Sequence, residues 1–242
     1  MRAFGALALG VALAISSVSR PARAHDSGQP HPGGTLRYDR LTGMAEFGLG
    51  WLVLPGAEVC VEPSIAGCSQ GDSSLALEAW QLFRANRSFA AGAGLLLGLT
   101  PTTDAPREDP PGVTRDHSRR YFTVEGTARY YAFSGPTFEG WLGLTSGLVV
   151  VSDRFESTQG TSDKALVGPR GVTIRTEGYT VGMALGAAYR WTESWSVGAA
   201  FRYGSWFLPE DPAKSPFGDE ASLRGQNNLF SLGFAIAYRV PL

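Results

Sequence analysis

The sequence has few of the residues that usually hold metal ions or carry redox chemistry. Among 242 residues it contains 3 His and 2 Cys. His25 and His31 lie in a polar stretch rich in Pro and Gly, in which no third metal ligand can be identified. Because protein zinc sites use three or four protein ligands, we expect neither a metal nor a cofactor.

Two further shortages exclude whole classes of protein. Acidic and basic residues nearly balance, with a formal net charge of -1, and no patch rich in Lys and Arg is present. This excludes the electrostatic signature of a nucleic-acid-binding protein. Beyond the amino-terminal segment, no apolar run reaches the ~20 residues of a membrane-spanning helix.

The first 24 residues have the three parts of a secretory signal peptide. Met1-Arg2 is a short basic start, Ala3–Val18 is apolar, and Ala22-Arg23-Ala24 matches the small-x-small cleavage pattern. Cleavage there removes three of the 21 basic residues and none of the 22 acidic ones, which leaves a net charge of -4. Residues 25–40 are predicted to form a flexible periplasmic tail, and residues 41–242 to form the folded domain.

The two cysteines lie close together in the segment CVEPSIAGC, as Cys60 and Cys68. An exported chain meets an oxidising compartment, in which cysteine pairs form disulfides. We therefore predict a Cys60–Cys68 disulfide within a loop.

The stretch Gly178–Trp206 has the clearest pattern in the chain. Apolar side chains alternate with Gly, Ala and polar residues in both of its halves, which is the period of a β-strand. The two halves meet at Thr192-Glu193-Ser194, and placing Trp191 opposite Trp195 keeps all apolar residues on one face. The stretch therefore predicts a β-hairpin with one continuous apolar face.

The same alternation recurs and predicts eight strands. Their approximate ranges are 43–53, 74–84, 89–99, 121–133, 138–151, 178–191, 195–206 and 228–240. Long polar segments, predicted as loops, follow every odd-numbered strand, at Leu54–Ser73, Pro101–Arg120, Ser152–Thr176 and Leu208–Asn227. Short turns follow the other strands, so all the long loops lie at one rim.

This asymmetry, with an apolar outer face, is typical of an outer-membrane barrel. Aromatic residues are expected to form an interfacial girdle at each rim. Those at the short-turn rim are Phe83, Phe89, Phe133, Phe138, Trp191, Trp195 and Tyr238, and those at the long-loop rim are Trp51, Tyr121, Phe122, Tyr179, Trp206 and Phe230. We predict an all-β fold, an eight-stranded antiparallel transmembrane up-and-down β-barrel. The alternative, a soluble lipocalin-like barrel, requires a polar outer face.

The inward positions of the predicted strands carry charges of both signs. They are Glu46, Glu78, Arg84, Glu125, Arg129, Glu139, Arg190, Arg202 and Arg239. Because an eight-stranded barrel is narrow and Arg pairs well with carboxylates, we interpret these residues as a structural network that fills the lumen. The alternative is a narrow gated conduit in which these pairs rearrange.

This architecture resembles the small eight-stranded outer-membrane barrels of Gram-negative bacteria, of the OmpA transmembrane-domain and OmpX type. The resemblance covers Leu41–Leu242 and rests on architecture, without a residue motif. It implies an outer-membrane location, contact with outer-membrane lipids and lipopolysaccharide, and the barrel-assembly machinery as a partner during biogenesis. Such barrels typically end in an aromatic residue, whereas this chain ends in Pro241-Leu242.

The predicted function is non-enzymatic: structural support, envelope integrity or surface recognition of an extracellular ligand by the long loops. The alternative is a porin-like narrow channel or transporter for small or apolar solutes. A lipid A-modifying enzyme is a third hypothesis, and it needs a His beside a Ser and an acid. Outside the tail only His117 is available, and we interpret it and its neighbours Arg115, Asp116, Ser118 and Arg119 as solvated loop charges.

Overall fold

A computed structural model describes residues 41–59, 69–102, 115–157, 171–216 and 219–242 of the chain. The predicted signal peptide, the tail and the Cys60–Cys68 disulfide lie outside these residues. In the part that is described, no helix has the length and hydropathy needed to cross a membrane.

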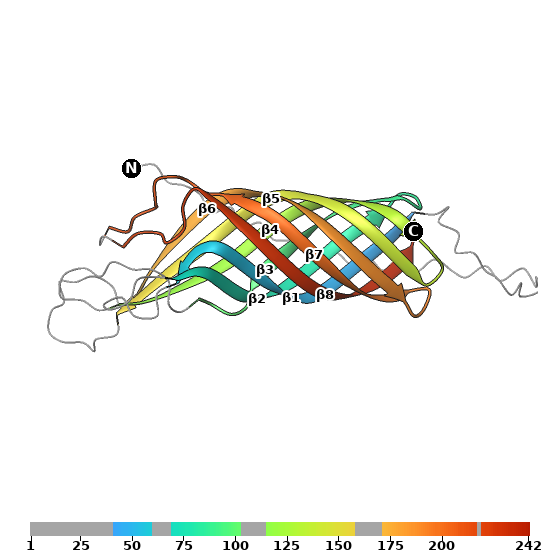
Figure 1. The fold of residues 1–242 in the computed structure, drawn as a ribbon, viewed down its shortest axis with the longest axis horizontal. Helices are drawn as coiled ribbons and strands as arrows, with labels where there is room; N and C mark the ends of the chain where they lie inside the picture. Colours follow the sequence, from blue (N-terminus) through green and yellow to red (C-terminus); the bar gives the residue numbers. More distant parts are fainter. Residues whose placement is uncertain (1–40, 60–68, 103–114, 158–170, 217–218) are drawn as a thin grey trace, which may run out of the picture. The chain divides into compact units, whose positions relative to one another are not determined.

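Eight antiparallel strands form a closed ring in which each strand pairs with its neighbours in the sequence (Figure 1). Their bounds are β1 Thr42–Val59, β2 Ser69–Arg84, β3 Phe89–Gly98, β4 Arg115–Ser134, β5 Phe138–Ser157, β6 Gly171–Arg190, β7 Trp195–Phe207 and β8 Gln226–Pro241. The ring closes where β1 pairs with β8, from Thr42 opposite Pro241 to Val53 opposite Phe230. The predicted all-β, up-and-down barrel is confirmed.

The β6–β7 hairpin has the predicted register. Tyr189 pairs with Val197 and Arg190 with Ser196, which continues to Trp191 opposite Trp195. Tyr179 and Tyr203 point outward and are exposed. The apolar face inferred from the sequence is therefore the outside of the barrel.

A belt of exposed apolar side chains surrounds the barrel. It includes Phe47, Leu49, Trp51, Leu95, Val124, Leu142, Leu144, Leu148, Val181, Met183, Leu185, Phe201, Leu232, Phe234 and Ile236. A soluble protein rarely exposes an apolar surface of this extent, whereas a barrel in lipid requires one. Because the closed ring also pairs its strand edges, the molecule satisfies the two conditions for spanning a membrane with strands.

The girdle at the short-turn rim is exposed as predicted, but two residues assigned to the other girdle point inward. Tyr121 and Trp206 are buried inside the barrel, with their ring centroids 5.3 Å apart. The alternation already contained this information, because Phe122 and Tyr203 are on the outer faces of the same strands. Trp80 on β2 also lies inside the barrel, and its neighbour Gln81 lies outside.

The strands extend further toward the long loops than the sequence predicted. Segments 54–59, 69–73, 115–120, 152–157, 171–176 and 226–227 were assigned to loops and are strand. The apolar outer face ends at the edge of the belt, but the alternation continues with polar residues outside, such as Arg154 and Glu156. Outer side chains that face water do not need to be apolar. The end of the apolar pattern therefore indicates where the strand leaves the membrane, and the strand itself continues further.

Candidate functional site

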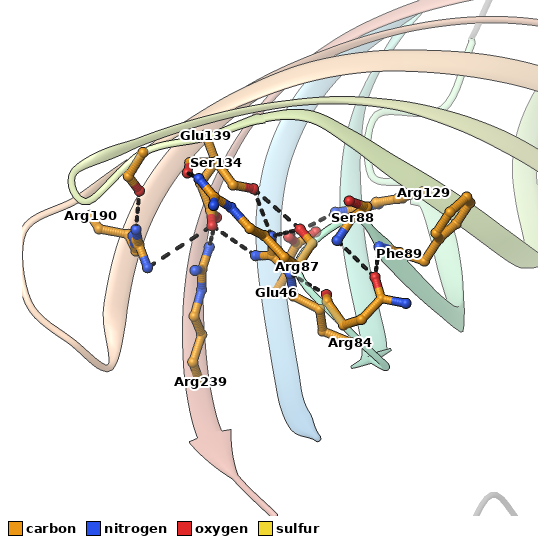
Figure 2. A network of polar contacts seen from close by, with 12 residues as sticks. Glu46, Arg84, Arg87, Ser88, Phe89, Arg129, Ser134, Glu139, Arg190 and Arg239 are labelled. Carbon is orange, nitrogen blue, oxygen red and sulfur yellow. Dashed lines mark hydrogen bonds and ion pairs between the residues drawn. The ribbon is translucent and has the colours of Figure 1, made fainter. Parts of the chain in front are cut away.

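The lumen near the short turns is organised around the carboxylate of Glu139, on β5 (Figure 2). Arg84 lies 2.7 Å from its Oε1 and Arg239 lies 2.6 Å from its Oε2, while Arg190 lies 4.0 Å from Oε1. The Glu139 side chain has no exposed surface. One acid therefore holds three guanidinium groups that come from β2, β6 and β8.

Arg84 also fastens the neighbouring turns. Its guanidinium donates to the backbone carbonyl of Asn86 at 3.2 Å, to that of Arg87, and to the Ser134 hydroxyl at 2.8 Å. It stacks on the ring of Tyr131, 3.8 Å from the ring centroid. These contacts connect the short turns across the lumen at the short-turn end of the barrel.

A second group of charges lies farther along the lumen. Arg129 donates to Glu46 at 2.8 Å and stacks on the ring of Trp141 at 4.0 Å. Arg202 pairs with Glu125 and approaches Glu78 to 3.9 Å. Each of the nine residues that we placed in the lumen network takes part in an ion pair inside the barrel.

A small cavity lies beside these charges. It has a volume of about 40 Å³, and its lining includes Glu46, Glu78 and Arg129 together with small residues of β7 and β8. The buried hydroxyl of Ser196 faces it and has no hydrogen-bond partner among the described residues. A cavity of this size has room for about three water molecules, and Ser196 and the charged side chains are their hydrogen-bond partners.

Beyond the charges, toward the long loops, the lumen is filled by apolar side chains. Its members are Leu52, Leu54, Ala57, Ala76, Leu96, Tyr121, Val149, Val151, Trp206, Leu208, Leu223 and Leu229. Sequence reasoning missed this apolar cluster because we sought charges at inward positions. The parity of Leu52, between the outward Trp51 and Val53, was the available signal.

Several buried polar side chains, which bond to one another, cover the apolar cluster. Asp72 accepts hydrogen bonds from Thr102 at 2.7 and 2.6 Å, from Arg119 at 2.7 Å, and from the hydroxyl of Tyr121. Burial by itself lowers the pKa of Arg119, but Tyr121 and the carboxylates of Asp72 and Asp153 outweigh it and hold that pKa above its ordinary value. Arg119 therefore remains a cation.

His117 lies in the same layer, and our interpretation of it as a solvated loop residue is wrong. It is buried on β4, with Nε2 2.7 Å from Oδ1 of Asp153 and its ring stacked on Phe155 at 4.2 Å. Ser222, in the β7–β8 connection, donates to the same Asp153 oxygen at 2.5 Å and accepts from Arg119 at 3.1 Å. Asp153 and Ser222 were not singled out from the sequence because both fall in segments assigned to loops.

We call Asp72, Thr102, His117, Arg119, Tyr121, Asp153 and Ser222 the outer cap. It joins β2, β4 and β5 to the β7–β8 connection, whose Ala221 packs with Phe155 and Ile174. Among the described residues, no three His, Cys, Asp or Glu side chains are grouped as a metal site would need. The arrangement closes the barrel and keeps its buried polar groups hydrogen-bonded.

No protein-family model and no curated protein matches this sequence. Solved structures do resemble it. Neisserial surface protein A is 12% identical, with 84% of this chain and 97% of that chain covered and a TM-score of 0.46. Ail of Yersinia pestis is 8% identical (83% and 99% covered, TM-score 0.43), and OprG of Pseudomonas aeruginosa is 14% identical (83% and 96% covered, TM-score 0.43). All three are small eight-stranded outer-membrane barrels, the group that the sequence resembles.

Proposed function

We propose that this chain, an eight-stranded outer-membrane β-barrel, is a closed, non-enzymatic scaffold that presents its outer strands and loops at the cell surface. One observation carries the proposal: the lumen is occupied in series by the Glu139 group, the Arg129 and Arg202 group, the apolar cluster and the outer cap. Beside the charges, the described residues border a cavity of about 40 Å³. A hydrated ion needs a continuous path, and these layers interrupt it.

The outer strands support a role in surface recognition. β4, β5 and β6 each have 20 residues, more than the ~10 that a tilted strand needs to cross the bilayer. Their extra residues continue the sheet beyond the apolar belt and expose alternate polar side chains, including Asp116, Arg154 and Thr173. A rigid sheet extension of this kind holds connecting loops at a fixed distance from the membrane surface.

The geometry of the outer cap supports a non-enzymatic role. In a serine hydrolase the hydroxyl donates to the imidazole, which removes its proton during attack. Here the Ser222 hydroxyl donates to Asp153 instead, and His117 contacts the same carboxylate. Asp153 therefore contacts both side chains, and the Ser222 hydroxyl donates to the carboxylate.

The alternative, a narrow channel, has one observation in its favour. The cavity borders a wall of small residues, including Gly198, Gly233 and Ala235. Rearrangement of the charges beside it would enlarge this space. Conduction would also require the apolar cluster and the outer cap to move apart.

The decisive experiment is single-channel recording of the purified full-length protein in planar lipid bilayers. Insertion is verified in the same preparation by the mobility difference between unheated and boiled samples on a denaturing gel. The closed scaffold predicts no discrete conductance steps, with a known open porin as the positive control. Reproducible steps from correctly folded protein contradict the proposal and favour the channel.

Surface presentation is tested separately in intact cells. Trypsin added from outside should cut the chain beyond the belt, whereas the barrel core stays protected. A variant in which residues 158–170 are replaced by a short Gly-Ser linker should keep the heat-dependent mobility shift. It should fail to restore the adhesion or detergent-resistance phenotype of a deletion strain. Full complementation by this variant contradicts a role for that loop.

A further inference from the structure

Three arginines stand on the outer surface of three neighbouring strands, just beyond the apolar belt. Arg120 is on β4, Arg154 on β5 and Arg175 on β6, and all three are exposed. Their positions have the parity of the outward apolar residues Phe122 and Tyr179 on the same sheet. They therefore point away from the lumen, into the space around the barrel.

The strand register brings these side chains together. Arg120 pairs with Ser152, and Ser152 pairs on its other side with Arg175. Arg154, two residues along β5, is a diagonal neighbour of both. Diagonal neighbours on one face of a sheet are ~7–8 Å apart at Cα, well within the reach of arginine side chains. The three guanidinium groups can therefore converge on one ligand above Ser152.

Their height above the belt is set by the sequence. Arg120 is two residues beyond Phe122, Arg154 is four beyond Val150, and Arg175 is four beyond Tyr179. With a rise of ~3.3 Å per residue and the tilt of a barrel strand, these steps correspond to ~5–10 Å above the apolar edge. This is the level of lipid headgroups.

Three exposed acids, Asp116, Glu156 and Glu177, lie on the same outer face, and one of them is paired with an arginine of the group. Arg154 pairs with Glu156, an exposed contact with both side chains more than half accessible. Arg120 and Arg175 form no ion pair with any described residue, although Glu177 is exposed nearby, and Asp116 lies farther out on β4. This differs from the lumen, where each arginine of the network is paired. Exposed surface pairs are weak, so Arg154 can exchange Glu156 for a ligand.

The adjoining strands β7 and β8 carry uncharged outward side chains at the edge of the belt. There Ser205, Gln226 and Asn228 point outward and are uncharged. The Ser205 hydroxyl donates to Asn228 at 2.8 Å, and the amide of Gln226 donates back to Ser205 at 3.4 Å. The three arginines thus lie on β4–β6, whereas the outward positions of β7 and β8 at the edge of the belt are uncharged.

We propose that Arg120, Arg154 and Arg175 form a binding site for the phosphate groups of an outer-leaflet glycolipid whose acyl chains lie along the apolar surface of β4–β6. Arginine binds phosphate through paired, charge-assisted hydrogen bonds. A phosphorylated lipid also matches the site's second property, because an apolar wall continues directly below the arginines. The inference rests on the proposed orientation, in which the long loops face outward.

The test measures lipid binding to the purified full-length protein in detergent by native mass spectrometry. The probes are bisphosphorylated lipid A and the same lipid with both phosphates removed. The test variant is Arg120→Gln/Arg154→Gln/Arg175→Gln. The matched control, Arg87→Gln/Lys214→Gln/Arg224→Gln, removes the same charge from exposed positions elsewhere.

The wild-type protein and the control should prefer bisphosphorylated lipid A, and the test variant should bind it at least tenfold more weakly. Equal binding by the test variant, or no preference for the phosphorylated probe, overturns the site. Competition by inorganic phosphate at equimolar concentration also overturns it, because the site would then be one for a free anion.

Two readouts separate this result from the proposed function. The heat-dependent mobility shift and the absence of conductance should be the same for all three proteins, since the substitutions lie outside the barrel. Trypsin accessibility in intact cells reports the orientation independently. Cleavage beyond the belt from the periplasmic side alone refutes the orientation, and with it the lipid site.

Discussion

Replacement of Glu139 by Gln is the sharpest test of the lumen network. The carboxylate is fully buried and faces the guanidinium groups of Arg84, Arg239 and Arg190 at 2.7, 2.6 and 4.0 Å. Gln has nearly the same volume as Glu, so the substitution removes the charge without leaving a cavity. Three buried cations then lose the carboxylate that they share.

The expected cost is large because an uncompensated buried charge is left behind. Removing one partner of a buried pair typically destabilises a protein by ~3–5 kcal/mol. The control is Glu220→Gln, which breaks an exposed pair with Lys214 whose side chains are 41% and 62% accessible. Exposed pairs contribute ~0–1 kcal/mol. The two substitutions remove the same charge and should differ by several-fold in effect.

The measurement is urea-induced unfolding of the barrel in lipid vesicles, followed by tryptophan fluorescence and by the heat-dependent mobility shift, with linear extrapolation to water. Adding Arg239→Gln to Glu139→Gln should recover part of the loss, because one cation no longer lacks its partner. A loss below ~1 kcal/mol for Glu139→Gln, or one equal to that of Glu220→Gln, refutes the view that this carboxylate neutralises the inner end of the lumen.

Two further changes probe the wall and the outer cap. Gly147→Ala should sharply reduce the folded fraction on the heat-shift gel, because the added Cβ would lie 2.0 Å from the Val124 carbonyl oxygen. The control Gly126→Ala, whose added Cβ has its nearest atom at 3.7 Å, should fold normally. Normal folding of both variants would show that the strands can move apart. Ser222→Ala removes a 2.5 Å hydrogen bond to Asp153, so it should destabilise the β7–β8 connection by ~1 kcal/mol and speed tryptic cleavage there. An unchanged cleavage rate would show that Ser222 does not help to hold the outer cap closed.

The alternation of side chains was sufficient for the ring and for the lumen-facing charges. Phe122 and Tyr179 point outward and Glu139 points inward because a pleated strand leaves no other choice once one face meets lipid. Strand ends were not predictable in the same way. Arg154 and Asp153 continue β5 beyond the belt, but their polarity is equally typical of a loop.

The outer cap needed information that no local pattern contains. His117 and Asp153 are 36 residues apart, and Ser222 is 69 residues beyond Asp153. They meet only because β4 pairs with β5 in one register and the β7–β8 connection folds over the lumen. A charged stretch before Tyr121 is more often solvated than buried, so the local signal favoured the wrong environment.

The seam between β1 and β8 has a kinetic consequence. Seven of the eight strand pairs join sequence neighbours, and the eighth joins the two ends of the domain. Until β8 has been synthesised, any partial sheet keeps two unpaired edges, which the bilayer interior does not tolerate. Closure of the longest possible loop is therefore a late step, and membrane insertion has to await the last strand. The unfolded chain therefore depends for a long time on the factors that prevent its premature folding. Loss of the final sixteen-residue strand, β8, should leave no partially functional barrel.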